Sequence, residues 1–194
     1  MKTKVFIIGG GGVGVYLSIA LERWGIPVVV YDGDTLDGGG ATRLPAVNIF
    51  GQTLLRKAAA LRVCGVKAMP QYVTRASDIP DCDIVIDATD ASSSTRKQFL
   101  DVARRKGAEY IRASYDLLIG NDGLPGEVLV SLTNTVGFGR AEGYRNAPAA
   151  HHAMIAAGYA AEHILRHIER GIPLPGVVRI PLNPNPSGGE NVQQ

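Results

Sequence analysis

The chain has 194 residues, of which 45% are hydrophobic and 20% charged, and its formal net charge is +2. This length suits one domain with a substantial core, and the small, scattered positive charge argues against a nucleic-acid partner. No apolar run reaches the roughly 18 residues of a membrane span, and the start lacks the features of a signal peptide. We therefore expect a cytoplasmic protein that binds neither nucleic acid nor membrane.

The first part of the chain alternates between strand and helix patterns. Alternation of this kind predicts a parallel sheet with right-handed crossovers. The expected elements are strands over residues 3–8, 26–31, 67–73, 83–88 and 109–114, and helices over 12–24, 45–63 and 95–106.

The pattern changes after residue 114. Residues 115–133 predict two strands around an Asn-Asp-Gly turn, which would extend the sheet in antiparallel fashion. An irregular loop over 134–148, an alanine-rich helix over 149–170 and a short strand from Gly176 follow. We expect an α/β fold with a doubly wound, Rossmann-like, mostly parallel sheet and an antiparallel C-terminal extension. Residues 1–181 would form one nucleotide-binding domain, and the polar residues 182–194 a disordered tail.

The first strand runs directly into a glycine turn. Gly9, Gly11 and Gly14 fit the pattern G-x-G-x-x-G between a strand and a helix. Such glycines let phosphates approach backbone N–H groups at the start of the helix. The turn predicts a bound nucleotide but leaves NAD(P), FAD, S-adenosylmethionine and ATP open.

An acidic residue, Asp32, ends the second strand. A carboxylate at this place accepts hydrogen bonds from ribose hydroxyls, and its charge repels a 2′-phosphate. The residue therefore argues against NADP, whereas NAD and ATP both remain possible.

Further residues resemble the ThiF/MoeB superfamily, the adenylyltransferases similar to ubiquitin-activating enzymes. The turn has the extra glycine of that family, Gly12, and the second strand ends in the pattern D-x-D as Asp32-Gly33-Asp34. At the family spacing Arg43 matches an arginine, while Gly40 stands in place of an asparagine. The resemblance is good over about residues 3–115 and looser over 148–170.

Other family positions also have counterparts. A lysine that reaches the nucleotide phosphates is matched by Lys57 or Arg56, and the family pattern D-x-x-D is matched by Asp87 and Asp90, the second of which would hold Mg²⁺. Thr95-Arg96 matches a Thr-Arg pair at the start of the next helix.

The resemblance implies ATP- and Mg²⁺-dependent adenylation of the C-terminal carboxylate of a small ubiquitin-like or sulfur-carrier protein. The implied nucleotide-binding residues are Gly9, Gly11, Gly12, Gly14, Asp32, Asp34, Arg43 and Lys57, and the implied catalytic residues are Arg43, Lys57 and the metal ligand Asp90. Each charged residue also has a structural alternative: Arg43 and Lys57 as solvated surface charges, and Asp90 as a helix cap.

Two departures from the family restrict the expected activity. Residues 114–148 contain no cysteine, so the thioester step of some family members is not expected. Because the sequence starts at its first strand, we expect the arginine that the family's N-terminal helix lends to the partner subunit to be absent or replaced. A homodimer is expected from the family. The alternatives are an NAD-binding oxidoreductase or sensor, or a degenerate, non-catalytic binding protein.

Three smaller groups of residues complete the prediction. Cys64 and Cys82 have no metal-ligand spacing and are expected to be packed in the interior. His163 and His167 stand at helical spacing, but a metal site would need a third ligand. "SYD", residues 114–116, ends a strand at the active edge, so Tyr115 or Asp116 is a candidate contact to the substrate.

Overall fold

The structure is a computed structural model that describes residues 2–35, 56–119, 125–135, 144–145 and 150–182. Four predicted features lie outside these residues: Arg43 with its neighbour Gly40, the start of the helix expected at Pro45, the turn at 121–123, and the tail.

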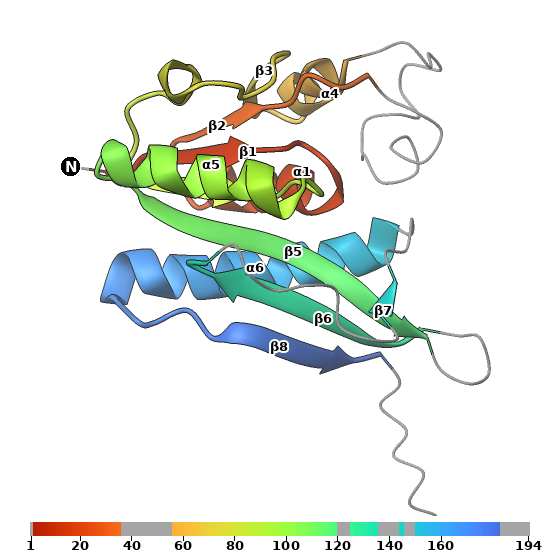
Figure 1. Ribbon diagram of the computed structural model, residues 1–194. Coiled ribbons are helices and arrows are strands. Elements are labelled where there is room, and N and C mark those ends of the chain that lie inside the picture. The colour runs from red at the N-terminus through yellow and green to blue at the C-terminus, as the bar shows by residue number, and fades with distance from the viewer. Residues whose placement is uncertain (1, 36–55, 120–124, 136–143, 146–149, 183–194) are drawn as a thin grey trace, which may run out of the picture.

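The described strands form one sheet, in the order β3-β2-β1-β4-β5-β6-β8, with β7 paired to β5 (Figure 1). The strands β1 to β5 are parallel, and β6, β7 and β8 add antiparallel pairs, as the sequence predicts. The strands are β1 (Val5–Ile8), β2 (Val28–Tyr31), β3 (Lys67–Met69), β4 (Ile84–Asp87), β5 (Glu109–Ile119), β6 (Pro125–Thr133), β7 (Tyr144–Arg145) and β8 (Gly176–Pro181).

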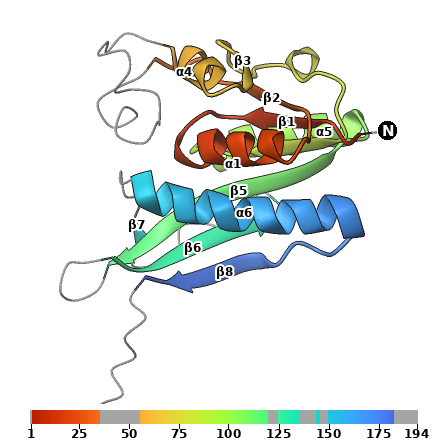
Figure 2. The same cartoon turned by 180° about the vertical axis from the view of Figure 1, so that it is seen from behind.

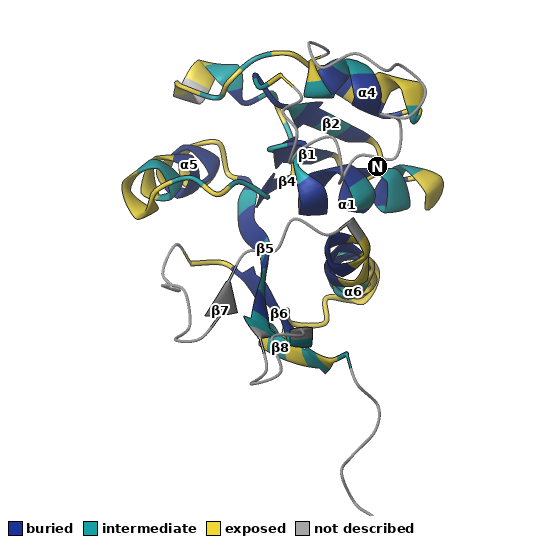
Figure 3. Cartoon of the chain, turned by 90° about the vertical axis from the view of Figure 1, so that its right-hand side faces the viewer, coloured by how far each residue is buried: buried dark blue, intermediate teal, exposed yellow. Residues whose placement is uncertain are grey.

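Helices cover both faces of this sheet (Figure 3). One face packs against α1 and α6, which lie side by side, and the other packs against α5 (Figures 1 and 2). The described helices are α1 (Gly12–Arg23), α4 (Lys57–Val63), α5 (Ser93–Arg105) and α6 (Ala150–Arg170), together with the short 3-10 helix η1 (Ala76–Asp78).

The central strand β1 explains why the first apolar run is continuous rather than alternating. Val5 and Ile7 belong to the core on the α1 and α6 face, while Phe6 and Ile8 belong to the core on the α5 face. All four are buried. A strand covered on both faces needs apolar side chains at every position, so the run VFII follows from its place in the middle of the sheet.

The strand β5 differs from the expectation of two separate strands. It runs without a break over eleven residues. Its first part pairs in parallel with β4, and its later part pairs antiparallel with β6, so that Arg112 faces Asp87 on one side and Thr133 on the other. The change from parallel to antiparallel pairing therefore needs no turn at residue 114, because one strand serves both neighbours.

Three boundaries of helices and strands also differ from the sequence prediction. The helix expected over 45–63 is described from Lys57 only, and Arg56 is extended because it forms a bridge with Thr35. The strand expected over 67–73 ends at Met69. The loop expected over 134–148 contains the short strand β7, whose pairing with β5 is a tertiary contact that no local pattern announces.

Candidate nucleotide-binding cleft

A cleft of about 500 Å³ lies at the carboxyl ends of the parallel strands. The chain leaves β1 toward β2 on one side and returns through β4 on the other, so the sheet order reverses here, and ligands of open α/β sheets bind at such points. The residues that line the cleft include Gly9, Gly11, Gly12, Asp32, Asp34, Lys57, Thr89, Asp90, Ser92, Ser93, Arg96, Arg112, Ser114, Tyr115 and Asp116.

The glycine turn joins β1 to α1, and each position in it is a glycine for a different structural reason. Gly9 has a φ of +95°, which a residue with a side chain rarely adopts. A Cβ on Gly14 would lie 1.9 Å from the carbonyl oxygen of Gly9, so this glycine lets the helix approach the strand. Gly11 is the N-cap of α1, lines the cleft and has open space around it. Space beside Gly11 is therefore left for a ligand rather than for packing.

Asp32 stands at the end of β2 and is 7% exposed. Its Oδ2 accepts a hydrogen bond from the N–H of Gly10 at 2.7 Å, and its Oδ1 accepts one from the N–H of Asp34 at 2.8 Å. Burial raises the pKa of this carboxyl, against the opposing effect of the Lys57 charge. The aspartate thus holds the glycine turn against the second strand at the cleft wall.

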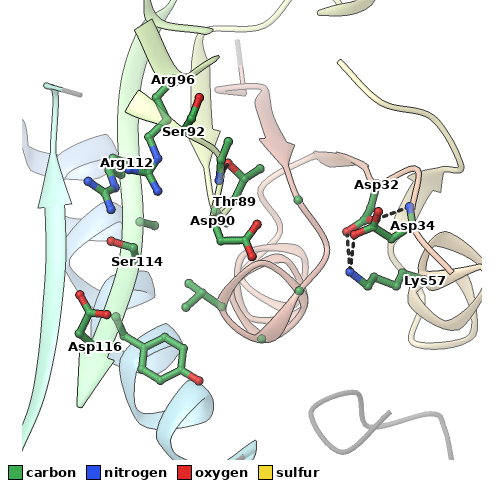
Figure 4. Close-up of a pocket in the computed structure, with 18 of the residues that line it drawn as sticks. Asp32, Asp34, Lys57, Thr89, Asp90, Ser92, Arg96, Arg112, Ser114 and Asp116 are labelled. Carbon is green, nitrogen blue, oxygen red and sulfur yellow. Dashed lines mark hydrogen bonds and ion pairs between the residues drawn. The ribbon is translucent and has the colours of Figure 1, made fainter. Parts of the chain in front are cut away.

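Lys57 is the first residue of α4 and points into the cleft (Figure 4). Its Nζ lies 2.7 Å from Oδ2 of Asp34 and 3.8 Å from Oδ2 of Asp32. The hydrogen bonds from Lys57 and from the hydroxyl of Tyr72 lower the pKa of Asp34. Because the Lys57 side chain is only 15% exposed, it is not a solvated surface charge.

Arg56 takes a different position from Lys57. Its guanidinium donates to the carbonyl oxygen of Gly33 at 2.6 Å, and it is not among the residues that line the cleft. The geometry therefore favours Lys57 over Arg56 as the basic residue of the nucleotide site.

The two aspartates of the D-x-x-D pattern have separate places. Asp87 is fully buried and accepts hydrogen bonds from the hydroxyl of Tyr110, at 2.7 Å, and from the N–H and hydroxyl of Thr89. Asp90 is exposed, lies in the middle of the cleft, and makes no hydrogen bond or ion pair with any other described residue (Figure 4). The cap of α5 is Ser92, which accepts from the N–H of Thr95, so Asp90 is not a helix cap.

A second group of charged residues lines the wall opposite Lys57 (Figure 4). Arg112 on β5 is 7% exposed, and burial, followed by the nearby charge of Arg96, lowers its pKa. Nε of Arg96, on α5, lies 4.0 Å from Oδ2 of Asp87. Sequence reasoning gave Arg112 no role, although an arginine inside an otherwise apolar strand was a visible signal.

The later part of β5 supplies the rest of this wall. Ser114, Tyr115 and Asp116 all line the cleft. The expectation that "SYD" ends a strand is wrong, because β5 continues to Ile119. Tyr115 and Asp116 do line the cleft, and their contact with a substrate stays a prediction.

The cysteines and histidines lie away from this chemistry. Burial raises the pKa of the Cys82 thiol to about 11, and burial also raises that of Cys64, so neither is poised as a thiolate. His167 binds Glu109 and the carbonyl of Ile172, and His163 stacks on Tyr159. Within the described ranges no group of three or more His, Cys, Asp or Glu side chains is placed to hold a metal ion.

The sheet order, the glycine turn and the cleft at the switch point together define a doubly wound, Rossmann-like α/β fold, as the sequence predicts. Among solved structures, the chain is similar to E. coli MccB with ATP, at 18% identity and a TM-score of 0.67, over 92% of this chain and 60% of that one. The microcin C7 biosynthetic enzyme MccB in complex with N-formylated MccA gives 17% identity and a TM-score of 0.67, over 92% and 61%. PaaA gives 19% and 0.60, over 86% and 64%.

These similarities concern the fold. The chain spans about three fifths of the length of the MccB structures just described. No protein-family model matches the chain, and no curated protein matches it in sequence. Among the described helices, none combines the length and apolar character needed to cross a membrane.

Proposed function

We propose that the chain uses ATP and Mg²⁺ to adenylate the C-terminal carboxylate of a small ubiquitin-like or sulfur-carrier protein. The observation that carries this proposal is the position of Asp90, whose carboxylate makes no hydrogen bond or ion pair with any residue that the structure describes. It lies in a cleft with the glycine turn and Lys57 on one side and Arg112 on the other. Its oxygens are therefore available, as far as the described residues go, to a ligand in the cleft.

The nucleotide would lie along the glycine turn. Gly11 leaves open space at the start of α1, where N–H groups and the helix dipole favour phosphates. Asp32 would bind the ribose with the acceptor capacity that its two backbone hydrogen bonds leave free, and Lys57 would exchange its contact with Asp34 for a phosphate oxygen. Arg43, which lies outside the described residues, is proposed as a second phosphate ligand from the family resemblance.

The residues present fit a magnesium ion that arrives with the nucleotide. Mg²⁺ is commonly held by one or two carboxylates together with substrate phosphates and water, so a single free carboxylate at Asp90 suffices. The ion would neutralise phosphate charge as pyrophosphate leaves.

The reaction needs no nucleophile from this chain. A carboxylate oxygen of the partner attacks the α-phosphorus of ATP, the bond from that phosphorus to the β-phosphate oxygen breaks, and pyrophosphate leaves. The product is an acyl adenylate. The high pKa of Cys82 and the lack of a cysteine over residues 114–148 agree with a reaction that stops before a thioester.

The MccB structures support this proposal by their contents, since they hold ATP in one case and N-formylated MccA in another. A protein of the same fold therefore binds ATP and also binds N-formylated MccA. We propose further that residues 1–181 work as one domain and that the active form is a homodimer, as the family resemblance implies.

The test is ATP–pyrophosphate exchange with a small ubiquitin-like protein ending in Gly-Gly as the acyl substrate. We expect Asp90→Ala to lower the exchange rate by about a hundredfold or more, because the metal contact stabilises charge in the transition state by several kcal/mol. The melting temperature should stay unchanged, since Asp90 is exposed and makes no hydrogen bond or ion pair with the residues that the structure describes. Asp101→Ala, at an exposed position of α5, is the matched control. Exchange at the normal rate in Asp90→Ala would refute the assignment.

A further inference from the structure

An exposed tyrosine, Tyr72 in the loop after β3, contacts the turn that follows β2. The residue is 61% exposed, so burial in the core does not explain its position. Its hydroxyl donates a hydrogen bond to Oδ1 of Asp34 at 2.6 Å, and its ring lies against Gly33. Both contacts fall on the turn Asp32-Gly33-Asp34, whose two aspartates line the cleft.

The contact with the Tyr72 ring explains why residue 33 is a glycine. A Cβ placed on Gly33 would lie 2.5 Å from Cδ2 and 2.7 Å from Cγ of Tyr72, closer than real Cβ atoms approach other atoms. The φ of Gly33 is not positive, so the backbone conformation does not require a glycine here. The carbonyl oxygen of Gly33 also accepts a hydrogen bond from Arg56. The turn is therefore held by residues from outside its own strand.

The same turn fixes the orientation of Asp32. The N–H of Asp34 donates to Oδ1 of Asp32 at 2.8 Å, and the N–H of Gly10 donates to Oδ2 at 2.7 Å. Because one of these two donors belongs to the turn itself, a shift of the turn would move the Asp32 carboxylate. The proposed function assigns this carboxylate to the ribose.

Asp34 has a second partner, which the proposed function takes away. Nζ of Lys57 lies 2.7 Å from Oδ2 of Asp34 (Figure 4), and it would leave this oxygen for a phosphate. The Tyr72 hydroxyl is bonded to the other oxygen, Oδ1, and can stay. The hydrogen bond to Asp34 raises the pKa of Tyr72, so the hydroxyl keeps its proton and remains a donor. Tyr72 then holds Asp34 while the nucleotide is bound.

We infer that Tyr72 positions the turn Asp32-Gly33-Asp34 for the ribose of the bound nucleotide. The inference rests on the proposed function, in which Asp32 binds the ribose. Tyr72 is not among the residues that line the cleft, so it acts on the ligand through the turn and is a positioning residue. The loop after β3 thereby becomes part of the nucleotide site.

Two nucleotides separate positioning of the ribose from a general structural role. ATP·Mg and 2′,3′-dideoxy-ATP·Mg differ only in the ribose hydroxyls, and their affinities for the full chain are measured by titration calorimetry. Tyr72→Phe keeps the ring on Gly33 and removes the hydroxyl. We expect this variant to weaken ATP·Mg by about threefold to tenfold, as for one lost hydrogen bond. The affinity of the dideoxy analogue should stay within about twofold, which makes the effect a coupling between Tyr72 and the ribose hydroxyls.

Two further variants and a stability measurement complete the test. Gly33→Ala displaces the ring and should cause the same selective loss, although the Tyr72 hydroxyl is still present in the chain. Tyr159→Phe is the matched control, since Tyr159 lies on α6 and is not among the residues that line the cleft. The melting temperature of Tyr72→Phe without ligand should stay within about 2 °C of the wild-type value, because the residue is exposed.

The outcomes distinguish this inference from the proposed function. If Tyr72→Phe weakens both nucleotides equally or weakens neither, Tyr72 does not position the ribose and the inference is wrong. The inference is also wrong if the wild-type chain binds the two nucleotides equally well. A selective loss in Tyr72→Phe together with an absence of pyrophosphate exchange in the wild-type chain would refute the proposed function alone. A wild-type chain that binds neither nucleotide would refute both.

Discussion

The glycines of the turn have the same chemistry but different tasks. Gly14 is needed for the fold, because its missing Cβ leaves room for the backbone of Gly9. Gly11 is not required for packing against the described residues, since none of them lies within 4 Å of a Cβ placed there. We therefore expect Gly11 to matter for binding of the nucleotide and Gly14 to matter for stability of the fold.

We expect Gly14→Ala and Gly11→Ala to affect different measurements. Gly14→Ala forces the helix away from the strand and should lower the free energy of unfolding by about 1–3 kcal/mol or more, measured by urea denaturation. Gly11→Ala should lower that free energy by no more than about 1 kcal/mol, the cost of a less favourable N-cap residue. It should weaken ATP·Mg by about tenfold to a hundredfold, because a methyl group obstructs phosphate hydrogen bonds. Weaker stability with normal nucleotide affinity in Gly11→Ala would contradict this division.

Among the helices, the alanine-rich α6 is held against the sheet in two ways: by apolar packing along one face and by an ion pair near its end. Its buried alanines, such as Ala153 and Ala160, are small enough to let it lie against α1 and the sheet. Near its C-terminal end, Nε2 of His167 lies 2.9 Å from Oε2 of Glu109 at the start of β5. This pair joins α6 to the first residue of β5, at the opposite end of the parallel strands from the cleft.

The pair makes part of the stability depend on pH. Burial disfavours the charged imidazole, but the hydrogen bonds to Glu109 and to the carbonyl of Ile172 outweigh it and raise the pKa of His167. Because the folded-state pKa lies above the unfolded one, the stabilisation is present below the ordinary histidine pKa of about 6.5 and is lost as the pH rises through the folded-state value.

His167→Gln should therefore lower the melting temperature at pH 5.5 and have less effect at pH 8.5. The difference in free energy should stay below about 1 kcal/mol, since both side chains reach solvent. His163→Gln, on the same helix and in contact with Tyr159, is the control. An effect of His167→Gln that grows with pH would show that the imidazole acts in its neutral form.

For the whole molecule, the main question is which nucleotide the cleft at the switch point of the sheet binds. Asp32 suits the ribose of NAD as well as that of ATP. Asp90, which lines the same cleft as the glycine turn, suits a metal-bound triphosphate.

A thermal-shift comparison tests this selection. Ligand that binds the folded state stabilises it by about 2.7 kcal/mol at a concentration of 100 Kd, so ATP·Mg should raise the melting temperature by several degrees. NAD should raise it little, and ATP with EDTA should be less effective than ATP·Mg. Stabilisation by NAD alone would overturn the adenylation proposal in favour of a dinucleotide-binding protein.

Much of this architecture was predictable because it is local. The continuous apolar run of β1, the glycine turn and the stop of α1 at Gly25 are each specified by neighbouring residues, so the parallel α/β fold and the place of Asp32 followed from the sequence. Lys57 and Asp90 were found through the resemblance to a family. The boundaries that failed, at Arg56, Met69 and residue 114, are those where pairing with a distant strand decides the conformation.

The sequence by itself therefore determined the order of elements, the nucleotide turn and the lack of a cysteine where a thioester would need one. Only the tertiary structure decided which charges belong to the fold and which are available to ligands. It tied Asp87 to Tyr110 and Thr89, placed Asp90 in the cleft with no hydrogen bond or ion pair to another described residue, and brought Arg112 to the cleft wall near Arg96. The reason is physical: the free energy of a charge depends on its hydration and on the groups around it, and those surroundings come from strands and helices far apart in the chain.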